Sequence, residues 1–171
     1  GLLAYNRAYF ARERNDFAAA YEFVLLAQEF NRDSRSNIPF EQSLYFQWGK
    51  TLYEAGSFDD AFAVFADGAY RYPEMKELAQ NSRAAYFQAL RRHGQQLNWP
   101  ESRRLVMEMT ELALLGPAEM EQQQEILSGW AEYFYRRAER RPLLEVIELM
   151  QSAHPEEPRL QEMRRVAERL P

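Results

Sequence analysis

Two stretches of the chain repeat one order of small and large apolar residues when the sequence is shifted by 41 residues. Small residues meet small ones, and apolar residues meet apolar ones, over the length of two helices. Where two helices cross closely, only Ala or Gly lets the backbones approach, and large residues fill the space beside them. The shift therefore predicts stacked helical pairs. The aligned residues include Ala8 with Gly49, Ala11 with Leu52, Phe17 with Phe58, Ala20 with Ala61, Val24 with Phe65 and Ala27 with Gly68.

The composition, together with the positions of Gly, Ser and Pro at helix ends, predicts helices along nearly the whole chain. The sequence is rich in Ala, Leu, Glu, Gln and Arg, and it has only 7 Gly and 8 Pro among 171 residues, which favours helix. Gly56 and Gly94 are typical of helix ends, Ser57 of an N-cap, and Pro142 of a first turn. The expected helical pairs span about 2–31, 40–72, 75–115 and 117–153, with the last pair dividing near Arg140 and the first two separated by a polar loop at 32–38; a capping helix follows at 158–169.

A regular set of aromatic, small and proline residues occupies 45–73: Tyr45, Trp48, Gly49, Leu52, Gly56, Phe58, Ala61, Phe65, Gly68 and Pro73. In this order it resembles a tetratricopeptide repeat, a helical pair of about 34 residues. Residues 4–32 form a looser copy, and later copies are degenerate, because the bulky Phe134 stands where a small residue is expected. The resemblance implies an all-α, right-handed α-solenoid of antiparallel helical hairpins, with about nine helices in a single domain over 1–171.

The same resemblance implies a binding groove. In tetratricopeptide arrays the first helix of each pair lines a concave face, which holds a partner peptide. The corresponding positions form an aromatic, locally basic trough suited to an acidic or carboxylate-bearing segment. Repeats that clamp a carboxylate in the chaperone-binding manner have Lys and Asn where Tyr5 and Tyr9 stand, so that role is disfavoured. The alternative is that Tyr5 or Phe46 packs on neighbouring helices. The groove positions are Tyr5, Tyr9, Arg12, Phe46, Lys50, Tyr53, Ala84, Gln88 and Arg91.

Catalytic and cofactor chemistry find no support in the sequence. The chain has no cysteine, which excludes disulfides and thiolate chemistry. We expect both histidines, His93 and His154, to lie at the surface or at helix ends. Adjacent carboxylates such as Asp59 and Asp60 fall in helix first turns, where acids offset the dipole. We therefore predict no enzyme, no metal and no cofactor.

Net charge and apolar run lengths bear on partners. The formal net charge of −5 disfavours a general nucleic-acid binder, and the Arg136-Arg137 and Arg140-Arg141 pairs are interleaved with glutamates. The apolar runs fall well short of the roughly 20 residues that a membrane span requires, so we predict no membrane insertion. The absence of cysteine fits either a reducing cytoplasm or a cell envelope, and the compartment stays open.

These patterns favour a non-catalytic protein–protein interaction scaffold that binds a partner peptide or helix in the concave groove. A homodimer through the first helix, using Leu2, Leu3 and Tyr5, is a second version of the same class. The alternative class is an accessory or regulatory domain of a larger enzyme or cell-envelope assembly protein, with its chemistry outside these residues. An enzyme within this chain ranks third.

Overall fold

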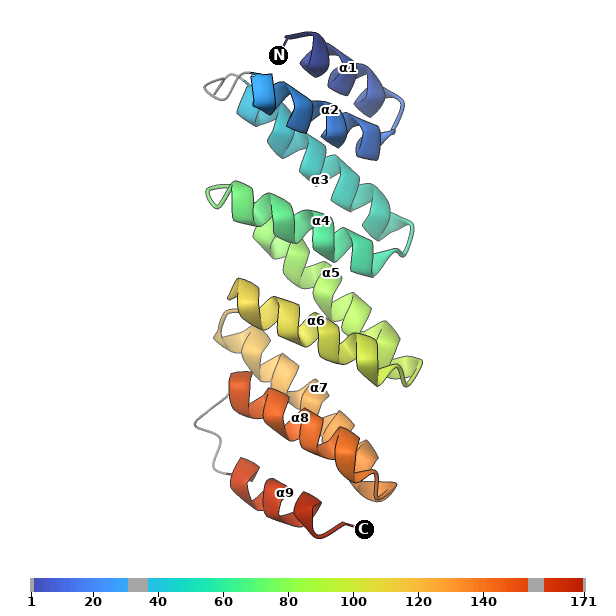
Figure 1. The fold of residues 1–171 in the computed structure, drawn as a ribbon, viewed down its shortest axis with the longest axis vertical. Helices are drawn as coiled ribbons and strands as arrows, with labels where there is room; N and C mark the ends of the chain where they lie inside the picture. The colour runs from blue at the N-terminus through green and yellow to red at the C-terminus, as the bar shows by residue number, and fades with distance from the viewer. Residues whose placement is uncertain (1, 31–36, 154–158, 171) are drawn as a thin grey trace. The chain divides into compact units, whose positions relative to one another are not determined.

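The computed structural model describes residues 2–30, 37–153 and 159–170. These residues form nine helices and no strand (Figure 1), which confirms the all-α prediction for this part of the chain. Residues 32–36 of the predicted loop at 32–38, His154 and the predicted helix start at Pro158 lie outside the described residues. The next helix begins at Ile38, two residues before its predicted start. The helices are α1 (Leu2–Glu13), α2 (Phe17–Phe30), α3 (Ile38–Glu54), α4 (Phe58–Arg71), α5 (Lys76–Gln95), α6 (Trp99–Leu112), α7 (Pro117–Arg136), α8 (Arg140–Ala153) and α9 (Arg159–Glu168).

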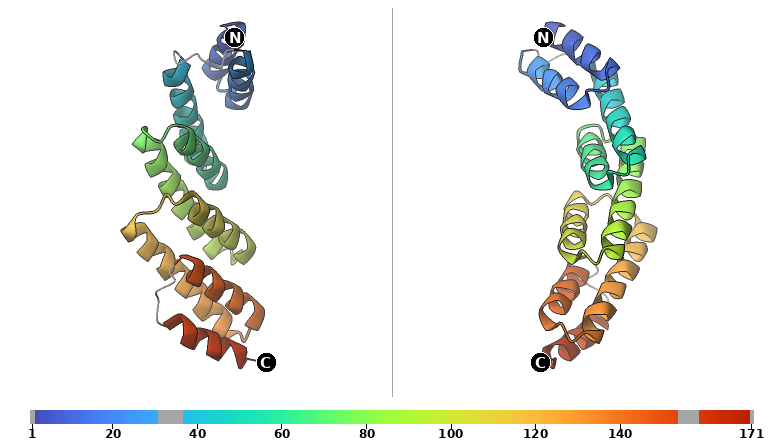
Figure 2. Two further views of the ribbon diagram at one scale, coloured as in Figure 1. Left: turned by 60° about the vertical axis from the view of Figure 1, so that its left-hand side comes forward. Right: turned by 90° about the vertical axis from the view of Figure 1, so that its right-hand side faces the viewer.

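The chain divides into two compact units, Gly1–Gln88 and Ala89–Pro171, with the boundary inside α5. In the first unit α1 packs against α2, and α3 packs against α4. In the right-hand view of Figure 2, α2 and α4 lie on one side of this unit and α3 lies on the other. In the second unit α7 packs against α8, and α8 also contacts α6 and α9.

Small residues lie where the helices of the first unit cross. The core around α1 and α2 combines Ala8, Ala11 and Ala20 with the larger Phe17 and Leu44. A Cβ atom at Gly68 would stand 3.0 Å from the side chain of Tyr45, so α4 passes close to α3 at this point. Of the other repeat positions, Ala27, Gly49, Ala61 and Phe65 are buried, Trp48 and Phe58 are half-buried, and Pro73 is exposed after α4.

The turn between α3 and α4 depends on Gly56. Its φ of +77° lies in the left-handed region, which glycine adopts without steric penalty. Ser57 precedes α4 as predicted, but its side chain makes no capping hydrogen bond. The backbone N–H of Ser57 instead donates to the carbonyl of Leu52, and the backbone carbonyl of Ser57 accepts from Ala61. The turn is therefore held by backbone bonds.

Three predicted helix boundaries in the second half of the chain are wrong. The helix predicted to run to about residue 115 ends at Leu112, because Ala113 adopts a φ of +51°. Gly94 lies inside α5, and the helix ends one residue later, before Leu97 takes a φ of +53°. The helix from Pro117 ends at Arg136 and not near Arg140, because Ala138 adopts a φ of +56°. At each of these places a residue other than glycine adopts the left-handed conformation. Pro142 is the third residue of α8, where the first turn tolerates proline.

The second unit is built around aromatic side chains. Trp130 and Phe134 of α7 stack with ring centroids 5.5 Å apart, and Trp99 of α6 contacts both rings. Trp99 also donates its indole N–H to Glu145 of α8 at 3.1 Å. Phe134 is 4% exposed. This large side chain, at a position where a small one was expected, packs against the two neighbouring tryptophans. His93 lies in the last turn of α5, as predicted, but it is buried at 8% exposure and does not lie at the surface.

Candidate partner-binding site

A pocket of about 450 Å³ opens between α3 and α5 in the first unit. It brings together the three residues that the sequence predicted for the groove on α3, namely Phe46, Lys50 and Tyr53. These side chains share one face of α3 because they are four and three residues apart. The remaining lining residues are Glu54 of α3, Phe65 of α4, and Asn81 and Ala84 of α5.

The pocket has rigid aromatic walls. The ring of Tyr53 lies against that of Phe58 in an edge-to-face contact with centroids 5.2 Å apart. Phe65 is 2% exposed and contributes a tightly packed apolar surface. Aromatic walls that are fixed before binding lose little entropy when a ligand enters. The pocket therefore presents preformed apolar area with one amide, that of Asn81, among the lining side chains.

The charge at the pocket is balanced. The Nζ atom of Lys50 lies 3.7 Å from Oε1 of Glu54, and both side chains are more than half exposed. An exposed ion pair of this kind contributes little stability and is screened by salt. Lys50 can thus exchange Glu54 for a carboxylate of a ligand at small cost. Of the basic side chains predicted for the groove, only Lys50 lines this pocket.

The predicted residues of α1 form a separate cluster. The Arg12 guanidinium lies over the Tyr9 ring, 5.0 Å from its centroid, and over the Phe40 ring at 4.9 Å. Tyr9 is 47% exposed. The cluster does not contribute to the lining of the pocket. Phe40, missed by the sequence reasoning, is its centre, and its place directly after Pro39 in the first turn of α3 was the available signal.

Tyr5 has an internal role. Its hydroxyl donates to Oε1 of Glu41 at 2.5 Å, and its ring meets Phe40 edge-to-face. Burial, followed by the hydrogen bond to Glu41, raises the pKa of Tyr5 well above its ordinary value. For Tyr5 the structure thus agrees with the packing alternative. On α5, Ala84 lines the pocket, whereas Gln88 is half-buried one turn further along, Arg91 is exposed, and neither lines it.

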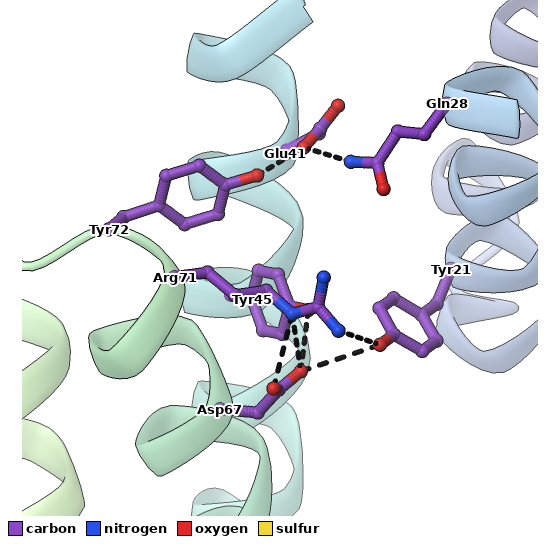
Figure 3. Close-up of polar contacts among 7 residues, drawn as sticks. All are labelled: Tyr21, Gln28, Glu41, Tyr45, Asp67, Arg71 and Tyr72. Carbon is purple, nitrogen blue, oxygen red and sulfur yellow. Dashed lines mark hydrogen bonds and ion pairs between the residues drawn. The ribbon is translucent and has the colours of Figure 1, made fainter. Parts of the chain in front are cut away.

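Two carboxylate centres, the buried Glu41 and the partly exposed Asp67, tie the helices of the first unit together (Figure 3). Glu41 is 5% exposed and also accepts hydrogen bonds from the amide of Gln28 at 2.8 Å and from the hydroxyl of Tyr72. With the bond from Tyr5, one carboxylate of α3 therefore joins α1, α2 and the segment after α4. The sequence reasoning did not identify Glu41, because its donors lie 13 to 36 residues away in the chain.

Asp67 of α4 forms the second centre. It accepts from the hydroxyl of Tyr45 at 2.6 Å, from that of Tyr21 at 3.4 Å and from Nε of Arg71 at 3.1 Å. Burial, followed by the hydrogen bond to Asp67, raises the pKa of Tyr45 far above its ordinary value. Figure 3 shows Tyr21 reaching this group from α2. The two centres link α3 and α4 to the preceding pair.

A second hollow of about 480 Å³ lies between α7 and α9 in the second unit. Its surface is mostly apolar, with Leu143, Met163 and Val166 facing it and Glu132 and Glu162 beside them. The sequence reasoning missed this hollow, because it depends on how α9 lies against α7 and α8. No groove residue predicted from the sequence belongs to it.

No family model, curated protein or solved structure matches the chain. Within the described ranges no helix is both long and apolar enough to cross a membrane. In the same part of the chain, His, Asp and Glu side chains form no group of three or more that could hold a metal ion. The pocket between α3 and α5 is thus assigned from its own geometry.

Proposed function

We propose that the first unit binds a segment of a partner protein in the pocket between α3 and α5, and that the chain acts as a non-catalytic interaction scaffold. The observation that carries this proposal is the meeting of Phe46, Lys50 and Tyr53 in one pocket with Asn81 of α5. Rigid aromatic side chains around a concave apolar surface are enriched at protein-binding sites.

The lining specifies the chemistry of the segment. One large apolar side chain of the partner would fill the space between Phe46, Tyr53 and Phe65. The Asn81 amide can donate to and accept from the partner backbone. A carboxylate of the partner, next to this apolar anchor, would replace Glu54 as the ion-pair partner of Lys50. The proposed ligand is therefore a short segment with an aromatic or aliphatic anchor beside an Asp, a Glu or a chain-terminal carboxylate.

A tetratricopeptide-like, right-handed arrangement of the helical pairs is part of the proposal. It is supported by the close approach of helices at Gly49 and Gly68 and by the left-handed turn at Gly56. In such an arrangement the first helix of a pair faces the groove, which agrees with the pocket position of three α3 residues.

Capture from lysate by matched variants tests the function. Wild-type chain, Lys50→Glu and Tyr53→Ala would be immobilised in parallel with Met163→Ala, which alters only the α7–α9 hollow. We expect one set of captured proteins to be retained by wild type and Met163→Ala and lost from the two pocket variants. Equal capture by all four chains would contradict a binding role for the pocket.

A further inference from the structure

The first helical pair exposes an unusual amount of apolar surface. Leu3 is 68% exposed, Phe10 65% and Phe30 72%, and Leu2 at the start of α1 reaches 80%. A hollow of about 240 Å³ lies between α1 and α2, and Leu3 and Phe30 are among its lining residues. Exposed apolar patches of this kind mark interaction surfaces. The hollow is lined by Leu3, Ala4, Arg7, Leu26 and Phe30.

The internal repeat shows what this surface is shaped to receive. Shifting the five lining residues by 41 positions gives their counterparts in the second pair, Leu44, Tyr45, Trp48, Asp67 and Arg71. Leu44 belongs to the core around α1 and α2, against which Tyr21 also packs. Each of the other four counterparts contacts Tyr21 of α2 directly. The equivalent position in the second pair is therefore filled by an aromatic side chain from another helical pair.

The hollow of the first pair, here called its socket, corresponds in position to the site that holds Tyr21 but has a more apolar lining. The counterparts Asp67 and Arg71, which bind the Tyr21 hydroxyl, are replaced by Leu26 and Phe30. Leu44 is 1% exposed, whereas its equivalent Leu3 is 68% exposed. The socket of the first pair thus suits a fully apolar side chain on a packed helix, without a hydroxyl.

We propose that a second copy of this chain covers the α1–α2 face and forms a two-fold dimer of helical pairs. Charge complementarity supports a second copy as the occupant. Of the two arginines of α1, Arg7 lines the hollow and Arg12 does not, whereas α2 has Glu22 and Glu29 and no basic residue. A two-fold arrangement that places α1 on the partner's α2 would set Arg7 near a glutamate twice, since a two-fold interface repeats each contact. The exposed Phe10 and Leu3 supply apolar side chains for the opposite socket.

Sedimentation velocity of the whole chain between about 1 and 100 μM tests the dimer. We expect wild type to sediment as a dimer at the upper concentrations, and Leu3→Glu with Phe30→Glu to remain monomeric throughout. Both side chains are exposed in the monomer, so unchanged helical circular dichroism would show that the variant folds. Tyr70→Glu, at a residue 79% exposed outside the α1–α2 hollow, is the matched control and keeps the dimer.

A charge-reversal pair tests the orientation of the two copies. Arg7→Glu should weaken dimerisation at least about tenfold, and Arg7→Glu combined with Glu29→Arg should restore it. A monomeric wild type at the highest concentration would overturn the proposal and leave a different helical partner as the occupant of this face. Dimerisation of the Leu3→Glu, Phe30→Glu variant would overturn it as well, because another surface would then hold the copies together.

Discussion

The backbone of Gly49 runs directly against the ring of Phe65. A Cβ atom at residue 49 would stand 2.6 Å from Cε1 of Phe65, closer than real side-chain atoms approach. Phe65 is 2% exposed and also lines the pocket between α3 and α5. One contact therefore joins a close crossing of α3 with α4 to the lining of the proposed binding site.

Gly49→Ala should lower the free energy of unfolding by up to about 2 kcal/mol. Overpacking against Phe65 outweighs the better helix propensity of alanine, which contributes about 1 kcal/mol in the opposite direction. Gly129→Ala is the matched control, because a Cβ there meets nothing within 4 Å, and it should stabilise the chain by about 0.5 to 1 kcal/mol. Urea unfolding measures the change in the free energy of unfolding for both variants. Stabilisation by both substitutions would show that α3 and α4 leave room for a Cβ atom at residue 49.

Removal of the Glu41 carboxylate should cost about 3 kcal/mol of stability. Glu41→Ala leaves the donors Tyr5, Gln28 and Tyr72 without their buried acceptor, and an unmet buried donor costs about 1 to 3 kcal/mol. Glu132→Ala, at an exposed carboxylate paired with Arg136, should change stability by less than about 0.5 kcal/mol. Thermal and urea unfolding measure both variants. A Glu41→Ala loss as small as that of the control would exclude a structural role for the carboxylate.

Two buried tyrosines should respond in opposite ways to loss of the hydroxyl. The Tyr86 hydroxyl has no hydrogen-bond partner among the described residues, so Tyr86→Phe removes an uncompensated polar group and should stabilise the chain by about 1 kcal/mol. Tyr45→Phe removes the donor to Asp67 and should destabilise it by about 1 kcal/mol. Denaturant midpoints at neutral pH measure the stability of both variants. Destabilisation by Tyr86→Phe would show that its hydroxyl makes a favourable hydrogen bond in the folded chain.

Stability should fall in alkaline solution above about pH 10. Burial raises the pKa of Tyr86 far above its ordinary value of 10.0, and burial with hydrogen bonding does the same for Tyr45 and Tyr72. Above that pH the unfolded chain releases phenolic protons that the folded chain keeps, so the free energy of unfolding decreases as pH rises. At neutral pH all three groups are protonated in both states and contribute no pH dependence.

For the fully buried Tyr86 the decrease amounts to at most about 1.4 kcal/mol per pH unit. Urea unfolding of wild type and Tyr86→Phe between about pH 8 and 11 isolates this contribution. The advantage of the phenylalanine variant should grow above about pH 10. A constant difference across the range would mean that Tyr86 ionises alike in the folded and unfolded chain.

The repeat of small residues was sufficient to predict that α1 packs against α2 and α3 against α4, because close helix crossings restrict side-chain size at fixed positions. The same spacing placed Phe46, Lys50 and Tyr53 on one face of α3, where they line a pocket. The boundary at Gly94 was wrong because Leu97 accepts the left-handed conformation, at a local cost of about 1 kcal/mol. Sequence reasoning recognises glycine at such positions far more readily than leucine.

Features that depend on the register between helices could not be predicted. Glu41 looks like an ordinary first-turn acid, and only the folded chain brings Tyr72 and Gln28 to it. Tyr5 occupies a groove position by spacing, yet its hydroxyl reaches a carboxylate 36 residues away. The apolar hollow beside Met163 depends in the same way on the placement of α9. Residue spacing within a helix specifies which side chains share a face. The packing of the helices then determines which residues that face contacts.

Affinity of a defined peptide for the α3–α5 pocket is the most direct test of the proposed function. Peptides selected from a random displayed library on the wild-type chain would be synthesised, labelled and titrated by fluorescence anisotropy. We expect the selected peptides to pair a large apolar residue with a carboxylate. Their dissociation constants should rise at least about tenfold for Lys50→Glu and Phe46→Ala, fall modestly for Glu54→Gln, and stay unchanged for Met163→Ala. Unchanged affinity in folded Lys50→Glu and Phe46→Ala chains would contradict binding at this pocket.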